Sequence, residues 1–194
     1  NLATVASGLA AVGKIPFISS YGMFSPGRNW EQIRTTICYN EQNVKIIGAH
    51  TGISVGPDGG THQAIEDMAI MRVISNMVVL APCDTIETKK ATIAAAKMNS
   101  PVYLRFGREK TPVFTTEKTP FNIGKAETFI LGADITIIAC GTLVYEALYA
   151  ANELKKAGLD AEVINSPSIK PLDEKTILAS AKKTGAIVTV EEHQ

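Results

Sequence analysis

Two kinds of apolar segment alternate along the chain. Short continuous runs, such as Val44–His50 and Met77–Leu80, are typical of strands that are buried on both faces of a sheet. Between such runs, apolar residues recur with the spacing of one helix face, as at Ile65, Met68, Ala69 and Val73. Alternation of strands and helices predicts parallel sheets covered by helices, which is the α/β class.

The first half of the chain contains four expected strands and two well-marked helices. The predicted strands are Ile15–Ser20, Val44–His50, Met77–Leu80 and Pro101–Phe106. A helix is expected from about Trp30 to Cys38. A second helix should run to about Met98, because Asp84 followed three residues later by Glu87 is a typical N-terminal cap.

The second half repeats the plan on a smaller scale. The pattern breaks down after Gly107, where Thr, Pro, Lys and Glu dominate, and we predict a linker over 113–127. Gly158 and Gly185 mark the ends of two further helices. The expected strands here are Ile135–Ala139, Ala161–Ile164 and Ala186–Val190. The sequence therefore predicts two consecutive parallel-sheet domains, over 1–112 and 128–194.

Composition narrows the classes of partner. The 194 residues carry 19 basic and 19 acidic side chains, so nothing favours a nucleic acid or an anionic membrane. No apolar run approaches the ~20 residues of a membrane helix. Three widely spaced cysteines form no disulfide framework, which indicates a reducing compartment such as the cytoplasm. The first residue is Asn1, and we interpret the chain as a piece of a longer protein, with structure missing at both ends.

The densest group of chemically useful residues lies between Gly48 and Gln63. His50, Asp58 and His62 fall within this stretch, and His50 ends a predicted strand, where α/β sheets place ligand sites. Three interpretations remain open at this point: histidines that only satisfy local backbone groups, a His/Asp/His metal site without a standard spacing, or a catalytic site. The glycines lack the ending of a phosphate-binding P-loop.

Other candidate residues lie on loops that follow strands. Tyr21, Phe24 and Trp30 are aromatic residues that either stack on a flat ring or pack in the core. Arg105 and Arg108 are either anion ligands or surface arginines. The acidic pair at 191–192 is interpreted as a solvated strand end and not as a functional site. The turn after residue 139 lacks the three glycines of a dinucleotide-binding fingerprint, which weakens an NAD-binding interpretation.

In this order, the segments resemble the transketolase family of thiamine diphosphate enzymes. His50–Gln63 is similar to the family's His-x-Gly-x-x-x-Gly-x-Asp-Gly-x-x-His-Gln stretch, which is the most specific feature. Ser20–Phe24 resembles its Ser-Thr-Phe-x-x-Phe loop. Weaker likenesses are Asn1–Ala3, Arg108, Ile169–Asp173 and Glu191–His193.

The resemblance implies a pyrimidine-binding domain, over 1–112, followed by the family's C-terminal domain. Tyr21 and Phe24 would stack on the aminopyrimidine of thiamine diphosphate, and Trp30 is left open as a third aromatic contact. His62, His50 and Asp58 would be the catalytic residues, with His62 carrying a proton and Asp58 bound to a substrate hydroxyl. The resemblance gives His50 and Arg108 the binding of a sugar and its phosphate.

The implied reaction moves a two-carbon ketol unit from a ketose phosphate to an aldose phosphate. The family's glutamate that protonates the aminopyrimidine would lie two positions before Asn1, and the Gly-Asp-Gly…Asn motif that holds diphosphate and magnesium or calcium has no counterpart in the chain. A separate domain or subunit would supply both, in a dimer or heterotetramer. We therefore expect no catalysis by this chain alone.

Four alternatives to a transketolase stay open, and the weakest is an NAD-dependent Rossmann enzyme, which only the alternating fold favours. 1-Deoxyxylulose-5-phosphate synthase shares the Asp-Gly-x-x-His-Gln motif, and the beta subunits of 2-oxoacid dehydrogenases share the two-domain plan. Another alternative is a non-catalytic partner or regulatory module. His50 and Asp58 both match the transketolase pattern, as does the segment Glu66–Ala69, so ketol transfer is favoured.

Overall fold

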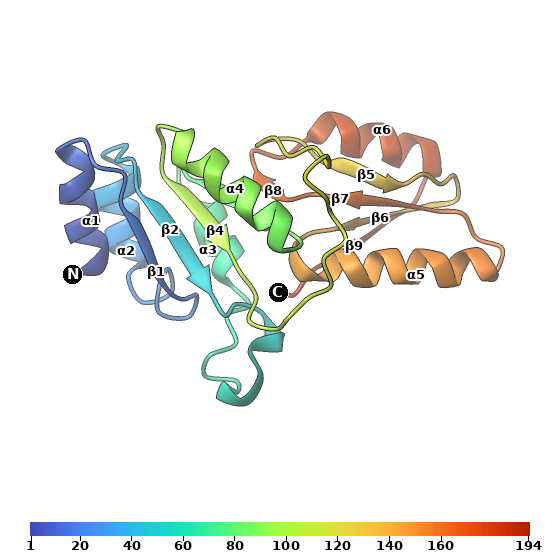
Figure 1. The fold of residues 1–194 in the computed structure, drawn as a ribbon, viewed down its shortest axis with the longest axis horizontal. Coiled ribbons are helices and arrows are strands. Elements are labelled where there is room, and N and C mark those ends of the chain that lie inside the picture. The colour runs from blue at the N-terminus through green and yellow to red at the C-terminus, as the bar shows by residue number, and fades with distance from the viewer.

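The computed structural model describes every residue from Asn1 to Gln194, and it confirms an α/β architecture with two sheets (Figure 1). The first sheet has the strand order β1-β2-β4-β3-β8, and its first four strands are parallel. These strands are β1 (Phe17–Tyr21), β2 (Lys45–Ala49), β3 (Val78–Leu80) and β4 (Val102–Arg105).

Helices cover both faces of the first sheet. Tyr103 packs with the helices on one face, whereas its neighbours Val102 and Leu104 pack against α4 on the other, because successive strand residues point to opposite sides. The Asp84 carboxylate accepts a hydrogen bond of 2.9 Å from the Glu87 amide, which confirms the predicted cap. The helices are α1 (Leu2–Ala11), α2 (Trp30–Gln32) continued by the π-helical η1 (Ile33–Cys38), α3 (Asp67–Arg72) and α4 (Thr85–Lys97).

The second sheet has the order β5-β7-β6-β9, with α5 and α6 on opposite faces (Figure 1). The predicted stop at Gly185 is confirmed, because this residue adopts a left-handed conformation with φ of 73°. The elements are β5 (Glu127–Ile130), β6 (Ile135–Ala139), η3 (Gly141–Leu143), α5 (Val144–Lys156), β7 (Ala161–Asn165), α6 (Glu174–Thr184) and β9 (Ile187–Val190).

Three elements differ from expectation. β5 is a strand that the sequence did not predict, and it runs antiparallel to β7. β8 (Ser168–Lys170) was also missed, since it has only three residues between prolines; it pairs antiparallel with β3 and so joins the first sheet. The glycine-rich loop contains the 3-10 helix η2 (Ile53–Asp58).

The structure therefore links the two halves through a shared sheet. The domain limits at 1–112, 113–127 and 128–194 stay a prediction. No helix has the combination of length and hydropathy that a bilayer-spanning segment requires.

Burial of Cys38 makes stability sensitive to alkaline pH. Burial raises the pKa of this thiol from 9.0 to about 12. The unfolded chain therefore loses the proton near pH 9, while the folded chain holds it, so the contribution of the thiol is complete below pH 9 and is lost as the pH rises toward 12. Between pH 8 and pH 10 the free energy of unfolding should fall by about 1.4 kcal/mol more in the wild type than in Cys38→Ala.

Urea unfolding followed by circular dichroism at the two pH values measures this difference. All other titrating groups are common to both proteins, so their effects cancel. Equal pH slopes for the two proteins would show that the thiol is already solvated in the folded state.

Candidate functional site

The candidate residues gather where the parallel strands of the first sheet end. Tyr21 is the last residue of β1 and pairs with Ala49, after which His50 leaves β2. Arg105 ends β4 beside them and pairs with Gly48. Carboxyl ends of adjacent parallel strands lie on one edge of a sheet, which is the usual place for a ligand site in open α/β folds.

Four rings that the sequence singled out form one cluster. The Tyr21 ring stacks on the His50 imidazole, with centroids 4.2 Å apart and planes inclined by 8°. Phe24 lies 6.2 Å from Tyr21, at 23°. The His62 imidazole presents its edge to both, at 5.9 Å from Tyr21 and 5.3 Å from Phe24. The structure thus brings together Tyr21, Phe24, His50 and His62.

The two histidines meet because the loop between them is closed at its base. Thr51 and Ala64 form an isolated parallel bridge, and the Gly52 amide donates to the Ala64 carbonyl at 2.8 Å. The Thr51 amide donates to Phe106 just beyond β4. His50 itself turns into this loop with a φ of 56°. Residues twelve positions apart in the sequence therefore share one cluster.

One ring nitrogen of His50 lacks a hydrogen-bond partner. This atom, Nδ1, is buried. A buried polar atom without a partner is costly, so such an atom beside aromatic rings is suited to a ligand that supplies the missing bond.

Asp58 and Arg108 form a second group. Arg108 Nη1 donates to the Val55 carbonyl at 2.6 Å and lies 3.4 Å from Asp58 Oδ2. Each side chain is 32% exposed, so the pair remains open to solvent. Neither residue makes a hydrogen bond to the imidazoles; Asp58 ends η2, and Arg108 lies in the segment that follows β4. Arg108 keeps further guanidinium donors free for an anion.

Trp30 does not belong to the cluster. Its indole Nε1 donates to the Ile70 carbonyl at 2.7 Å, and the ring packs on the core of the first domain. The position over Phe24 is instead occupied by the Arg28 guanidinium, 5.0 Å from the ring centroid. Trp30 is thus a partly buried residue that packs against the core.

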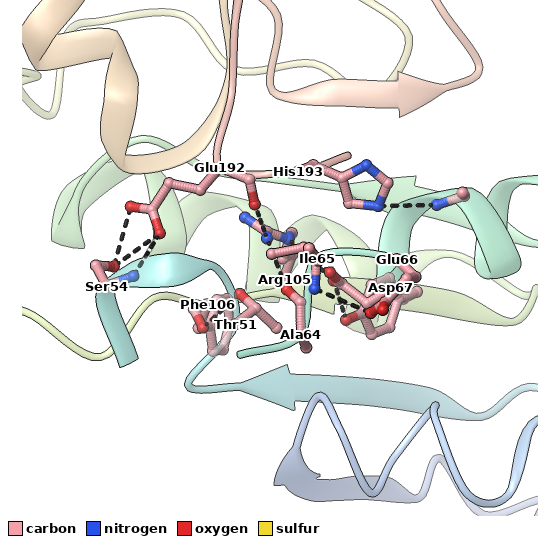
Figure 2. A network of polar contacts seen from close by, with 12 residues as sticks. Thr51, Ser54, Ala64, Ile65, Glu66, Asp67, Arg105, Phe106, Glu192 and His193 are labelled. Atoms are coloured by element: carbon pink, nitrogen blue, oxygen red, sulfur yellow. Dashed lines mark hydrogen bonds and ion pairs between the residues drawn. The ribbon is translucent and has the colours of Figure 1, made fainter. Parts of the chain in front are cut away.

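Arg105 is buried and structural, which corrects its interpretation as a surface arginine or an anion ligand. It is 8% exposed, and its Nε lies 2.9 Å from Asp67 Oδ2. The Tyr103 hydroxyl donates to the same carboxylate at 2.6 Å, and burial raises the pKa of Tyr103 well above its usual value, so the phenol keeps its proton. Arg105 Nη2 donates to the Glu192 carbonyl at 2.7 Å (Figure 2).

Glu192 was expected at a solvated strand end, and this expectation is wrong. The residue is 9% exposed, and its carboxylate accepts hydrogen bonds from the Ser54 amide, the Ser54 hydroxyl and the Thr142 hydroxyl (Figure 2 shows those from Ser54). Sequence reasoning missed it, although its place just after β9 at a sheet edge was an available signal.

The structure contains no group of three or more His, Cys, Asp or Glu side chains arranged to hold a metal ion. His50 and His62 meet through ring contacts with Tyr21, and Asp58 pairs with Arg108. The His/Asp/His arrangement considered from the sequence is therefore not a preformed metal site.

Comparison with known proteins identifies the family. Residues 1–113 match the transketolase pyrimidine binding domain, and residues 124–194 match the transketolase C-terminal domain. Each half of the sequence matches a domain of the same family, so the chain belongs to the transketolase family.

Similar proteins include sections and subunits of transketolases. A putative transketolase C-terminal section from Methanocaldococcus jannaschii is 46% identical, covering 100% of this chain and 61% of that protein. A 6-deoxy-6-sulfo-D-fructose transketolase subunit from a Clostridium strain is 42% identical, with 98% and 59% covered. The chain thus spans about three fifths of these relatives.

Solved structures with a similar fold are also transketolases. A split-gene transketolase, described as an inactive β4 tetramer, superposes with a TM-score of 0.90 at 43% identity, covering 97% of this chain and 61% of that one. Transketolase from Campylobacter jejuni gives a TM-score of 0.85 at 27% identity, covering 97% and 30%.

Proposed function

We propose that this chain provides the pyrimidine-binding half of the active site of a transketolase, an enzyme that transfers a two-carbon ketol unit between sugar phosphates. The observation that carries the proposal is the ring cluster of Tyr21, Phe24, His50 and His62 at the strand ends. Family membership supports the use of thiamine diphosphate. The proposed specificity for sugar phosphates rests on the Asp58 carboxylate and the Arg108 guanidinium.

The ring cluster fits the aminopyrimidine of thiamine diphosphate. His50 covers one face of Tyr21 and the Arg28 guanidinium lies over one face of Phe24, so the proposed stacking surface consists of the remaining faces of these two rings. The buried His50 Nδ1 offers a polar contact beside these rings. The bound cofactor supplies a nucleophilic carbon for ketol transfer; the protein binds, orients and moves protons.

His62 is suited to carry a proton. The Thr61 hydroxyl lies 2.9 Å from His62 Nδ1, which orients the ring and leaves Nε2 free. The ring nitrogen of an imidazole can accept a proton and return it in each cycle. In this role His62 would hold a proton removed from a substrate hydroxyl.

Asp58, Arg108 and His50 are assigned to the sugar phosphate. A carboxylate accepts hydrogen bonds from sugar hydroxyls, and a guanidinium binds phosphate through charge-assisted bonds. Asp58 and Arg108 lie together at one side of the loop. His50 stacks on Tyr21 and is the first residue after β2, where the loop begins.

A second domain or subunit would complete the site. It would hold the diphosphate together with magnesium or calcium, in a dimer or heterotetramer. Support comes from relatives named as transketolase sections and subunits. Assays of the proposed function therefore use the complete protein assembled with that diphosphate-binding part.

Replacement of His62 by alanine tests the proton-carrying role. In the assembled enzyme, His62→Ala should lower kcat for ketol transfer by about 100-fold or more, which is typical of a lost acid–base group. The affinity for thiamine diphosphate should stay nearly unchanged, because the stacking rings remain. Steady-state kinetics and cofactor titration measure the two quantities. An unchanged kcat would remove His62 from proton transfer.

Replacement of Arg108 tests phosphate recognition. Arg108→Ala should raise KM for phosphorylated sugars by roughly 10- to 100-fold, because charge-assisted hydrogen bonds are lost, and should affect unphosphorylated sugars far less. Lys110→Ala, which removes an exposed charge two residues away, is the matched control. Equal effects of Arg108→Ala on both sugar classes would contradict the assignment.

A further inference from the structure

A side chain of the C-terminal half, Glu192, is hydrogen-bonded to the loop that carries Asp58. Ser54 lies in η2, and its amide and hydroxyl both donate to the Glu192 carboxylate, at 3.1 Å and 2.8 Å. The two residues are separated by 138 positions. Glu192 follows β9, so this contact connects the second sheet to the candidate site (Figure 2).

The Glu192 carboxylate is fully engaged as an acceptor. The Thr142 hydroxyl, in η3 of the second half, donates to its Oε1 at 3.0 Å. All of its partners donate to it, and the Ser54 amide can only donate; a glutamine in its place would accept through one uncharged oxygen instead of two carboxylate oxygens. Charge-assisted hydrogen bonds of this kind are roughly twice as strong as neutral ones.

The backbone around Glu192 is fixed as well. Arg105 donates to the Glu192 carbonyl, so the main chain is held by the buried ion pair while the side chain reaches the loop. On the loop side, Gly52 has a φ of 85°, and a Cβ at this position would collide with the Glu192 carboxylate. Carboxylate and loop backbone therefore pack in direct contact.

The attachment point is close to the residues assigned to substrate. Val55, which directly follows Ser54, accepts the hydrogen bond from Arg108, and Asp58 lies just beyond a kink at Gly56, whose φ of 78° and ψ of −134° are not helical. A displacement of Ser54 would move the Val55 carbonyl, and with it the anchor of the Arg108 guanidinium. Asp58 is connected to Ser54 through only three residues.

We propose that Glu192 is a positioning residue through which the C-terminal domain sets the placement of Asp58 and Arg108. It does so by holding Ser54, without contact to substrate. The consequence for sugar binding rests on the proposed function of the site, whereas the attachment itself does not.

Glu192→Gln tests the attachment in the complete protein. Amide hydrogen exchange of Ser54 should become at least about 10-fold faster, because a charge-assisted hydrogen bond is lost. Thr51, whose amide donates to the Phe106 carbonyl, is the internal reference and should change much less. Glu191→Gln, at the exposed neighbouring residue, is the matched control and should leave both amides unchanged.

Kinetics of the assembled enzyme test the consequence. Glu192→Gln should raise KM for the sugar phosphate by roughly 5- to 10-fold, with kcat and thiamine diphosphate affinity within about 2-fold, since binding contacts are displaced and the ring cluster is not. Ser54→Ala should raise KM less, and should add little in the double variant because both changes break the same contact.

The outcomes separate the two claims. Unchanged Ser54 exchange in Glu192→Gln, or equal changes in Glu191→Gln, would overturn the attachment. Faster exchange with an unchanged KM would overturn the positioning role. If the wild-type assembly transfers no ketol unit, the proposed function fails, and faster Ser54 exchange would still establish the attachment.

Discussion

Asp67 and Arg105 form a buried ion pair at the point where three separate segments of the chain meet. Their side chains are 1% and 7% exposed. Removing two charges from water is costly, and it is offset only when the remaining donors and acceptors are satisfied. Here the Tyr103 hydroxyl donates to Asp67, and Arg105 donates to the Ala64 and Glu192 carbonyls. Losing one partner would cost about 3–5 kcal/mol, so the segments stay together.

Each of these segments continues into the candidate site. Ala64 closes the loop just after His62, Arg105 precedes Arg108 on the strand end, and Glu192 reaches Ser54 from the second half. Loops that carry functional side chains are commonly mobile unless a rigid base positions them. The ion pair provides that base, which explains how a transketolase-family chain can present imidazoles and a charged pair from loops.

Patterns of neighbouring residues predicted the features that depend on short-range interactions. Apolar runs located the parallel strands, the Asp84 cap marked a helix start, and the stretch His50–Gln63 identified two histidines that share one ring cluster, whereas its Asp58 pairs with Arg108. The sequence did not predict partners that are distant along the chain. Arg105 and Glu192 are 87 positions apart. The position of Glu192 after a strand suggests a place at a sheet edge but does not reveal its partners, and β8 is short and pairs with the distant β3.

Native-state hydrogen exchange on the unmodified protein tests the central claim most directly. If the ion pair holds its three segments as one unit, the amides of Thr51, Gly52 and Gln194, which donate to Phe106, Ala64 and Ile65, should exchange with one shared opening free energy. The loop tip around Gly59 should exchange faster. Rapid exchange at Gln194 alongside slow exchange at Gly52 would contradict the account, since the C-terminal segment would then open independently.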